Sequence, residues 1–400
     1  MDNRVIVVGG GPVGYTLAAT LEHHAIPYVM LEAGDHIFED PRAGTIHPPS
    51  LELFRSVGLI DLLQSEGSIV SSFQFRDRRQ GVVAEFDLST LNDETDFPYR
   101  LMLEQHKVCR LINEYLGLEH SDKLRRQHTL VSVAQDGGGV TATAQTPDGA
   151  VELRGRYLVG CDGGRSQVRK SMNVDFTGFQ YGERFLVLST PFDFGAFGYA
   201  RTNYIADPEE WCALFRVPGV NQSGMWRILF PAEPDATEEA LFDEAAVQQR
   251  IQGFHAKDGP YEIFHRNLYA VHQRVASRYR DGRLLLAGDA AHINNPLGGM
   301  GMNFGFHDVF NLADKLRQIY HEGGDESLLD LYDRQRRTVA SEYLQRQTIE
   351  NKKNIEQKDP QVRQQFYEEL RATAGHPVKR KAYLMRAAMI EGYRYSLSIQ

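Results

Sequence analysis

The sequence has few cysteines, no excess of positive charge and no long apolar run. Its three cysteines, Cys109, Cys161 and Cys212, are far apart and lack a CxxC spacing, so they indicate neither a disulfide framework nor a zinc site. The 14 histidines show no metal-ligand spacing such as HExxH, and we expect no bound metal. The formal net charge is -9 and the basic residues are scattered. A nucleic-acid-binding protein would need a basic stripe, so no nucleic-acid partner is expected.

The composition is that of a globular protein. Hydrophobic residues make up 42% of the 400 positions, which is enough for a sizeable core and for two or three compact units. No apolar run approaches the roughly 20 residues that cross a bilayer, and the first expected strand begins within a few residues of Met1, which leaves no room for a signal peptide. We therefore expect a cytoplasmic protein that acts on a small molecule and has no membrane partner.

The N-terminal residues predict a βαβ unit that binds an adenine dinucleotide. Arg4 to Val8 is typical of a buried parallel strand, Tyr15 to His24 of a helix and Tyr28 to Glu32 of a second strand. The run from Gly9 to Gly14 between the first strand and the helix fits GxGxxG. In this motif Gly9 makes the tight turn, Gly11 lets the backbone approach the pyrophosphate and Gly14 allows close helix packing. Glu32 stands where an acid accepts the ribose hydroxyls, which favours FAD or NAD over a cofactor with a 2'-phosphate.

Two further motifs follow buried strands. Asp162 and Gly163 come directly after a strand at Tyr157 to Gly160, and would place a carboxylate and a flexible turn beside the cofactor, with Arg165 and Arg169 near its phosphates. Gly288 and Asp289 follow a strand at Leu284 to Ala287, where Asp289 can hold the ribityl chain of a flavin. The glycine-rich segment from Pro296 to Asn303 then starts a helix, and the free N–H groups of its first turn can face an anionic ring.

Because these motifs lie far apart in the chain, the cofactor-binding domain is predicted to be discontinuous. We assign residues 1–71, 106–175 and 266–345 to it. Residues 72–105 and 176–265 are predicted to form a substrate-binding domain, since the stretch from Phe185 to Phe230 alternates polar and apolar residues as an antiparallel sheet does. Residues 346–400 are predicted to form a C-terminal helical segment.

The ordered trio of motifs resembles the class A flavoprotein monooxygenases of the para-hydroxybenzoate hydroxylase type, the FAD-binding-3 type family. The resemblance covers roughly the first 345 residues, and it is specific because each motif follows a buried strand. It implies an α/β fold in which a discontinuous Rossmann-like FAD-binding domain of the GR2 type carries an antiparallel β-sheet substrate domain and C-terminal helices. These helices are expected to pack on the body or on a second subunit of a homodimer. The resemblance also implies that Arg42 touches the pyrophosphate and that Gln105 binds the flavin's sugar-phosphate region.

The function implied by this resemblance is that of an FAD-dependent NAD(P)H aromatic hydroxylase. NADH or NADPH would reduce the flavin, O2 would add at C4a, and the outer oxygen of the hydroperoxide would attack a phenolic or N-heteroaromatic ring. Such chemistry requires a water-poor cavity, a positive environment for the reduced flavin and a hydrogen-bond partner for the substrate phenol.

Candidate residues can be named for each of these roles. The catalytic candidates are the backbone of Pro296 and the side chains of His47 and Arg216. Rings can stack on a flat substrate and a guanidinium can grip a carboxylate or phenolate, so the predicted substrate wall consists of Tyr199, Tyr204, Arg216 and Trp226. The predicted cofactor contacts are Gly9, Gly11, Pro12, Val13, Gly14, Glu32, Ala33, Arg42, Gln105, Asp162, Gly163, Arg165, Gly288, Asp289, Pro296, Gly299, Gly301, Met302 and Asn303.

Two alternatives share the fold. A flavin-dependent oxidoreductase or halogenase would carry the same three motifs, although the halogenase signature WxWxIP is absent and the chain has only two tryptophans. A non-catalytic FAD-fold binding protein would be expected to lose the turn at Gly299 to Gly301, which this chain keeps. The motifs are compatible with NADH and with NADPH, and with phenolic acids, hydroxypyridines and larger rings.

Overall fold

The computed structural model describes residues 3–39, 44–219 and 222–400. Within these residues the first large sheet has the strand order β18-β19-β12-β1-β2-β8 and is parallel except for β18. Strands β1, β2, β12 and β19 are buried at every position, because helices and a second sheet cover both faces of a parallel sheet. The strands are β1 (Val5–Val8), β2 (Tyr28–Leu31), β8 (Leu124–Arg125), β12 (Tyr157–Gly160), β18 (Arg280–Asp281) and β19 (Leu284–Leu286).

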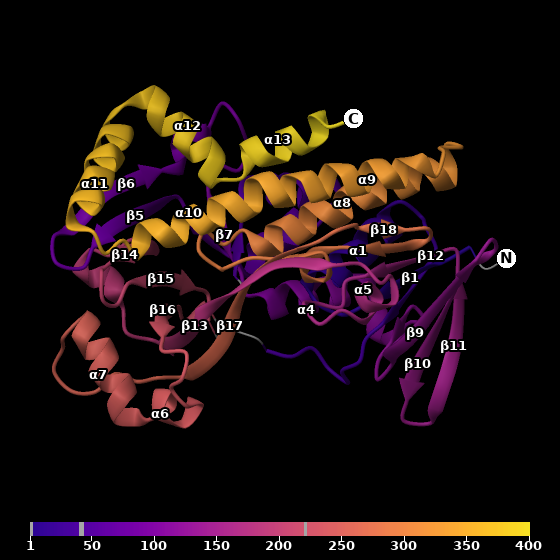
Figure 1. Cartoon of the computed structure of the whole chain (residues 1–400), viewed down its shortest axis with the longest axis horizontal. Coiled ribbons are helices and arrows are strands. Elements are labelled where there is room, and N and C mark those ends of the chain that lie inside the picture. The colour runs from indigo at the N-terminus through magenta and orange to yellow at the C-terminus, as the bar shows by residue number, and fades with distance from the viewer. Residues whose placement is uncertain (1–2, 40–43, 220–221) are drawn as a thin grey trace.

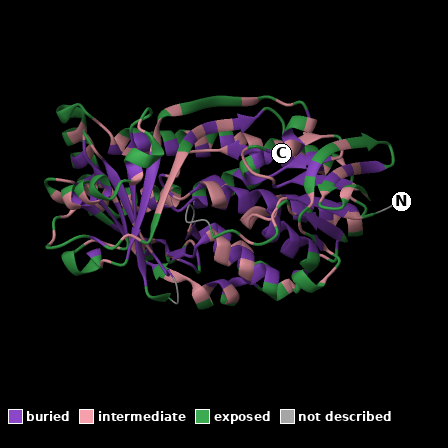
Figure 2. Cartoon of the chain, turned by 90° about the horizontal axis from the view of Figure 1, so that it is seen from below, coloured by how far each residue is buried: buried purple, intermediate pink, exposed green. Residues whose placement is uncertain are grey.

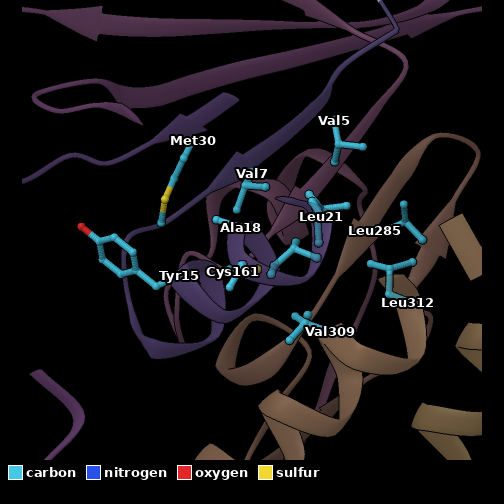
Figure 3. Packing of buried hydrophobic residues seen from close by; sticks show 14 of the residues in the cluster. Val5, Val7, Tyr15, Ala18, Leu21, Met30, Cys161, Leu285, Val309 and Leu312 are labelled. Carbon is cyan, nitrogen blue, oxygen red and sulfur yellow. The ribbon is translucent and has the colours of Figure 1, made fainter. Parts of the chain in front are cut away.

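Two helices pack against each other on this sheet. Helix α1 (Pro12–His23) contacts α8 (Gly301–His321), and Figure 3 shows side chains of α1 and β1 meeting those of β19 and α8 in one core. The contact is close, since a Cβ atom on Gly305 would lie 2.5 Å from Val13 Cγ2. Helix α4 (Gln105–Leu116) packs on α1 and α5 (Gln167–Ser171) on β12. The predicted βαβ unit and the strand at Tyr157 to Gly160 are confirmed.

A three-stranded antiparallel meander covers part of the parallel sheet. It consists of β9 (Thr129–Asp136), β10 (Gly139–Thr146) and β11 (Gly149–Gly155), paired in the order β11-β10-β9. A smaller sheet has the order β3-β7-β4, with β3 (Thr45–Ile46), β4 (Ser68–Val70) and β7 (Arg100–Met102). Helices α2 (Pro48–Ser56) and α3 (Ile60–Glu66) lie between β3 and β4 in the chain.

The second large sheet has the order β20-β17-β13-β16-β15-β14-β5-β6 and is antiparallel except between β14 and β5. One face packs against α6 (Glu238–Phe242) and α7 (Glu244–Phe254). Strand β17, which we expected in the cofactor-binding domain, belongs to this sheet, and with β13 it forms a long ribbon joining the two halves of the molecule (Figure 1). The strands are β5 (Ser72–Asp77), β6 (Gly81–Asp87), β13 (Phe176–Thr190), β14 (Thr202–Ala206), β15 (Cys212–Val217), β16 (Met225–Ala232), β17 (His265–Ala276) and β20 (His292–Ile293).

The C-terminal residues are helical, as predicted, and pack on both halves of the body. Helix α9 (Ser327–Val339) continues through a π-helical turn (Ala340–Leu344) into α10 (Gln345–Ile355), and the pair forms one long rod, coloured orange in Figure 1. Helices α11 (Pro360–Gly375) and α12 (Pro377–Ala387) pack on β5 and β6. There the ring of Tyr383 stacks on the ring of Phe86, with 4.4 Å between the ring centroids. Helix α13 (Ile390–Ser398) returns to α9.

Burial is continuous through both halves of the molecule. Figure 2 shows buried residues running through the two large sheets and the helices between them, with exposed residues at the periphery. The three cysteines are all buried and free. No helix in the described part of the chain combines the length and the apolar character that a bilayer crossing requires. Among the same residues, no group of His, Cys, Asp and Glu side chains could hold a metal ion.

Candidate cofactor and substrate site

A cleft of about 660 Å³ lies at the carboxyl ends of β1, β2 and β12 and continues beneath one face of the eight-stranded sheet. This edge of a parallel sheet is where open α/β folds bind their ligands. All three sequence motifs line the cleft: Gly11 and its neighbours, Asp162, and Asp289 with the turn at Pro296. The fold therefore gathers distant segments of the chain into one site.

The glycine turn is shaped by close backbone contacts. Gly9 has a φ of +106°, and a Cβ atom there would lie 2.4 Å from the Cys161 carbonyl oxygen. A Cβ atom on Gly14 would lie 1.9 Å from the Gly9 carbonyl oxygen, whereas one on Gly11 would have nothing within 4 Å. Gly11 is thus open to the cleft, and it precedes the first turn of α1, whose amides have no intrahelical acceptor. This cradle fits a pyrophosphate.

The end of β2 contributes a carboxylate that is already oriented by the glycine turn. Glu32 accepts hydrogen bonds from the amides of Gly10 at 2.5 Å and Gly34 at 2.7 Å, and it lines the cleft together with Ala33. Gln105, the first residue of α4, also lines the cleft. Arg42, expected at the pyrophosphate, lies outside the described residues.

Asp162 combines a structural contact with an open one. Its Oδ2 atom accepts hydrogen bonds from the amides of Gln167 and Val168 at 2.7 and 3.1 Å and so caps α5. Its Oδ1 atom is buried and has no hydrogen-bond partner among the described residues. Since a buried carboxylate oxygen without a partner is costly, this atom fits a hydroxyl donor supplied by a dinucleotide in the cleft.

Of the two arginines expected near the phosphates, only one faces the cleft. Arg165 lines it, together with Gly163. Arg169 instead donates to the Ala290 carbonyl at 2.8 Å and the Gly164 carbonyl at 2.7 Å. Arg169 therefore ties the second motif to the third.

The third motif is supported from behind by a buried charged cluster. Asp308 accepts hydrogen bonds from the Gly288 amide at 3.0 Å, from His292 Nε2 at 2.7 Å and from Arg336 Nε at 2.7 Å. Burial alone would raise the pKa of Asp308, but the charges of His292 and Arg336 hold it below its usual value, so the carboxylate stays ionised. Asp289 lines the cleft, while Gly288 packs against Val13.

The segment from Pro296 to Gly301, which we call the flavin-facing turn, forms the far end of the cleft. Pro296, Gly299, Met300 and Gly301 line it. The Pro296 carbonyl accepts the Gly299 amide at 3.0 Å, so this carbonyl is already engaged within the turn. The first amide of α8 that bonds along the chain is that of Phe304, to the Met300 carbonyl, so the amides of Gly301 and Met302 precede the helical ladder and lie at its positive end.

Asn303 and His47, two of the predicted site residues, are absent from the lining of the cleft and hold this turn in place. Asn303 Nδ2 donates to the carbonyls of Gly299 and Thr45, both at 2.8 Å, and Oδ1 accepts from the His47 amide and the Ser50 hydroxyl, both at 2.8 Å. The ring Nε2 of His47 lies 2.9 Å from the Gly298 carbonyl. Burial, followed by the charge of Arg100, lowers the pKa of His47 to about 3, so the ring is neutral at ordinary pH.

The predicted substrate wall lies mostly on the opposite face of the eight-stranded sheet. Tyr199, Arg216 and Trp226 line a second hollow there, and Trp226 donates to Asp193 at 3.2 Å. Tyr204 is on the cleft side but packs against Phe73 and Phe215 in the core, outside the cleft lining.

The residues that do reach the cleft are their immediate neighbours. Side chains alternate along a strand, so Phe215 and Val217 of β15 and Arg227 and Leu229 of β16 face the cleft while Arg216 and Trp226 face away. Two of the predicted wall residues, Arg216 and Trp226, therefore lie on strands that border the cleft, but their side chains point to the opposite face of the sheet. Phe215 packs with the cluster beneath α11 and α12, and Trp226 packs with the cluster beneath α7. The sequence pattern alone does not say which face of a strand meets which cluster, because that depends on the cross-strand register.

Strand β17 supplies the rest of the wall. Tyr269, Ala270, Val271 and His272 line the cleft, where a register shift interrupts the pairing of β13 and β17. Burial, followed by the charge of Arg274, lowers the pKa of His272. Its Nδ1 atom is buried without a hydrogen-bond partner among the described residues, so a neutral imidazole nitrogen is available to a ligand.

A glycine cradle joined to an apolar chamber fits an oxidoreductase that depends on a dinucleotide cofactor. Comparison with known proteins agrees: a family model described as an FAD binding domain matches residues 2–347. The chain belongs to this family.

Its relatives are monooxygenases. The chain is 33% identical over 366 residues to para-nitrophenol 4-monooxygenase of Pseudomonas sp. strain WBC-3, covering 90% of this chain and 89% of the relative. It is 30% identical over 361 residues to 6-hydroxy-3-succinoylpyridine 3-monooxygenase of Pseudomonas putida, covering 90% and 91%. The crystal structure of p-nitrophenol 4-monooxygenase from Pseudomonas putida superposes with a TM-score of 0.92 at 30% identity, over 98% of both chains. The expected class, a class A flavoprotein aromatic monooxygenase with this fold, is confirmed.

Proposed function

We propose that this protein uses FAD, NADH or NADPH, and O2 to hydroxylate a single-ring phenol or hydroxypyridine. The observation that carries the proposal is the continuity of the cleft, which runs from the glycine cradle to an apolar chamber between the flavin-facing turn and the eight-stranded sheet. Bound FAD would supply the activation of O2 and the electron transfer. Family membership supports NAD(P)H as the reductant.

The residues that would hold FAD are those at the strand ends. Gly11 and the start of α1 receive the pyrophosphate, Glu32 the adenosine ribose, and Asp162 and Asp289 the sugar chain. Asp162 Oδ1, buried without a described partner, is the strongest sign that a hydroxyl donor belongs there. The amides of Gly301 and Met302 at the start of α8 provide the positive environment that a negatively charged ring requires.

Apolar side chains form much of the chamber wall, and we assign roles to two of its polar side chains. Val187, Leu229 and Val271 give it apolar walls, and Phe215 offers a ring on which a flat substrate can stack. Arg227 is 8% exposed and places a guanidinium group in the wall of the chamber. This group lies close to the backbone at Gly44, since its Nη1 atom would be 3.7 Å from a Cβ atom placed there. His272, kept neutral by burial, can accept a hydrogen bond from a phenol and help to ionise it.

The choice of a single-ring substrate follows from this wall and from the two relatives matched over most of their length, whose names carry para-nitrophenol and 6-hydroxy-3-succinoylpyridine. A phenol with a second, anionic or strongly polar substituent would place that substituent at Arg227. The test is a panel of such phenols and hydroxypyridines added to the FAD-loaded protein while NADH or NADPH oxidation is followed. A substrate in the panel is expected to accelerate oxidation and yield a hydroxylated product. Unchanged oxidation across the whole panel, with faster turnover of multi-ring substrates, would contradict the single-ring assignment.

A further inference from the structure

Helix α10 is hydrogen-bonded, from outside the cleft, to the flavin-facing turn and to the strand that precedes it. Asn351 Nδ2 donates to the Leu297 carbonyl at 3.0 Å, and Gln345 Nε2 donates to the Ile293 carbonyl at 3.1 Å. A Cβ atom on Gly298 would lie 2.8 Å from Asn351 Nδ2, so helix and turn are in close contact. In the described part of the chain, α10 contributes no residue to the lining of the cleft. Its contact with the site is therefore indirect.

A buried polar network extends this contact to the substrate wall. Gln273, Asn295 and Thr348 are 1%, 0% and 0% exposed. Gln273 Oε1 accepts from the Asn295 amide at 3.0 Å, Gln273 Nε2 donates to Thr348 Oγ1 at 2.8 Å, and Asn295 Nδ2 donates to the Thr348 carbonyl at 2.9 Å. Since Gln273 directly follows His272 in β17, one helix is bonded both to the turn and to the strand opposite it.

These contacts determine which way the peptide groups of the turn face. A trans peptide points its C=O and N–H in opposite directions. Asn351 holds the Leu297 carbonyl, and His47 and Asn303 hold the next two carbonyls. Of the amides that follow these carbonyls, that of Gly299 donates to the Pro296 carbonyl within the turn. The amide of Met300 points away from the Gly299 carbonyl that Asn303 holds, and Met300 lines the cleft.

The turn needs this outside support because its own backbone is soft. Gly298 and Gly299 have φ values of +108° and +66°, and glycine crosses between such conformations at little cost. Without a partner for the Leu297 carbonyl, the peptide that follows it would be free to rotate. The rest of the turn, up to the Met300 amide, would then lose the fixed orientation of its first peptide group.

We propose that Asn351, together with the Gln273–Asn295–Thr348 network, is a positioning residue for the flavin ring. The C-terminal helix α10 holds the flavin-facing turn in the orientation that presents its amides to the ring, and so favours the reduced, anionic cofactor over the oxidised one. The inference rests on FAD as the cofactor and is independent of the aromatic substrate.

The test compares Asn351→Ala with Lys353→Ala, a control variant in which alanine replaces an exposed residue of the same helix. Affinities for oxidised and reduced FAD are measured by titration of the apoprotein, together with the midpoint potential of the bound flavin, all without substrate or NAD(P)H. Asn351→Ala is expected to reduce the ratio of reduced to oxidised affinity by about tenfold, as loss of one hydrogen bond near a charge would. For a two-electron couple this is about 30 mV toward negative potential. Lys353→Ala is expected to leave the ratio unchanged.

A second pair of variants separates positioning from folding. Thr348→Val removes the hydroxyl that accepts from Gln273, whereas Thr348→Ser keeps it. The potential is expected to shift in the valine variant and to return in the serine variant, whatever the melting temperatures of the two apoproteins. An Asn351→Ala protein with the potential of Lys353→Ala, or equal potentials for the two Thr348 variants, would overturn the proposal. Failure of the unaltered protein to bind FAD would instead reject the cofactor assignment.

Discussion

Replacement of Asn303 by alanine tests the support of the flavin-facing turn from the side of α8. The side chain is fully buried and makes four hydrogen bonds: two donated to carbonyls and two accepted from an amide and a hydroxyl. Each lost bond leaves a buried polar group without its partner, at about 1 kcal/mol for a typical bond and more where no water can enter. Allowing for relaxation and entry of water into the space left, we expect Asn303→Ala to lower the free energy of unfolding by about 3–5 kcal/mol.

Asn311→Ala is the matched control, because Asn311 lies in the same helix, is partly exposed and donates a hydrogen bond of 3.0 Å to Gln335 Oε1. Its expected cost is about 1 kcal/mol. Urea unfolding of the two apoproteins, followed by circular dichroism, measures both costs. FAD affinity is expected to fall with Asn303→Ala and not with Asn311→Ala. Equal urea midpoints for the two variants would refute the view that the hydrogen bonds of Asn303 hold the flavin-facing turn in place.

Three further predictions follow from the site. Arg227→Ala should lower kcat/KM for the true substrate by about 10- to 100-fold, which corresponds to the loss of a hydrogen bond to a charged group. Arg216→Ala, on the opposite face of the sheet, should change kcat/KM by less than about twofold. Equal effects of the two variants in steady-state kinetics would contradict the assignment of Arg227 to the cleft. Asp162→Asn keeps a side-chain oxygen that accepts from the first amides of α5, so this variant should still fold. Titration with FAD should show about tenfold weaker binding. Unchanged affinity for FAD would show that Asp162 is not part of the cofactor site. Because the pKa of His47 is about 3 in the folded protein and about 6.5 when unfolded, the unfolded state alone takes up this proton as the pH falls below about 6.5. Between pH 7.5 and 5.5 the loss of stability should be about 1.4 kcal/mol smaller in His47→Gln than in the unaltered protein, and identical pH profiles would show that the ring is not held neutral.

The elements that could be predicted from the sequence are those specified by local pattern. The strand at Tyr157 to Gly160 and the glycine turn after Val8 are encoded within a few residues, by buried runs and by backbone geometry that only glycine fits. The motifs at Asp162 and Asp289 were found because each follows such a strand, and the structure brings both to the cleft.

The parts that escaped prediction depend on contacts between distant residues. Asn303 looks like a cofactor ligand in the sequence, yet its partners include Thr45 and His47, more than 250 positions away. Arg216 and Arg227 are equally polar residues on neighbouring strands, and only the register of β15 against β16 decides which one meets the cleft. The contact of α10 with Leu297 has no sequence signal at all, because an asparagine on a polar helix is most often a solvated residue.

Turnover under ¹⁸O2 tests whether oxygen is inserted into a bound aromatic ring in this cleft. The FAD-loaded protein is supplied with NAD(P)H and the phenol or hydroxypyridine that most accelerates NAD(P)H oxidation, and the product is analysed by mass spectrometry. We expect a product that carries one ¹⁸O atom, formed in proportion to the NAD(P)H consumed. Recovery of all the reducing equivalents as hydrogen peroxide, with the aromatic compound unchanged, would contradict it.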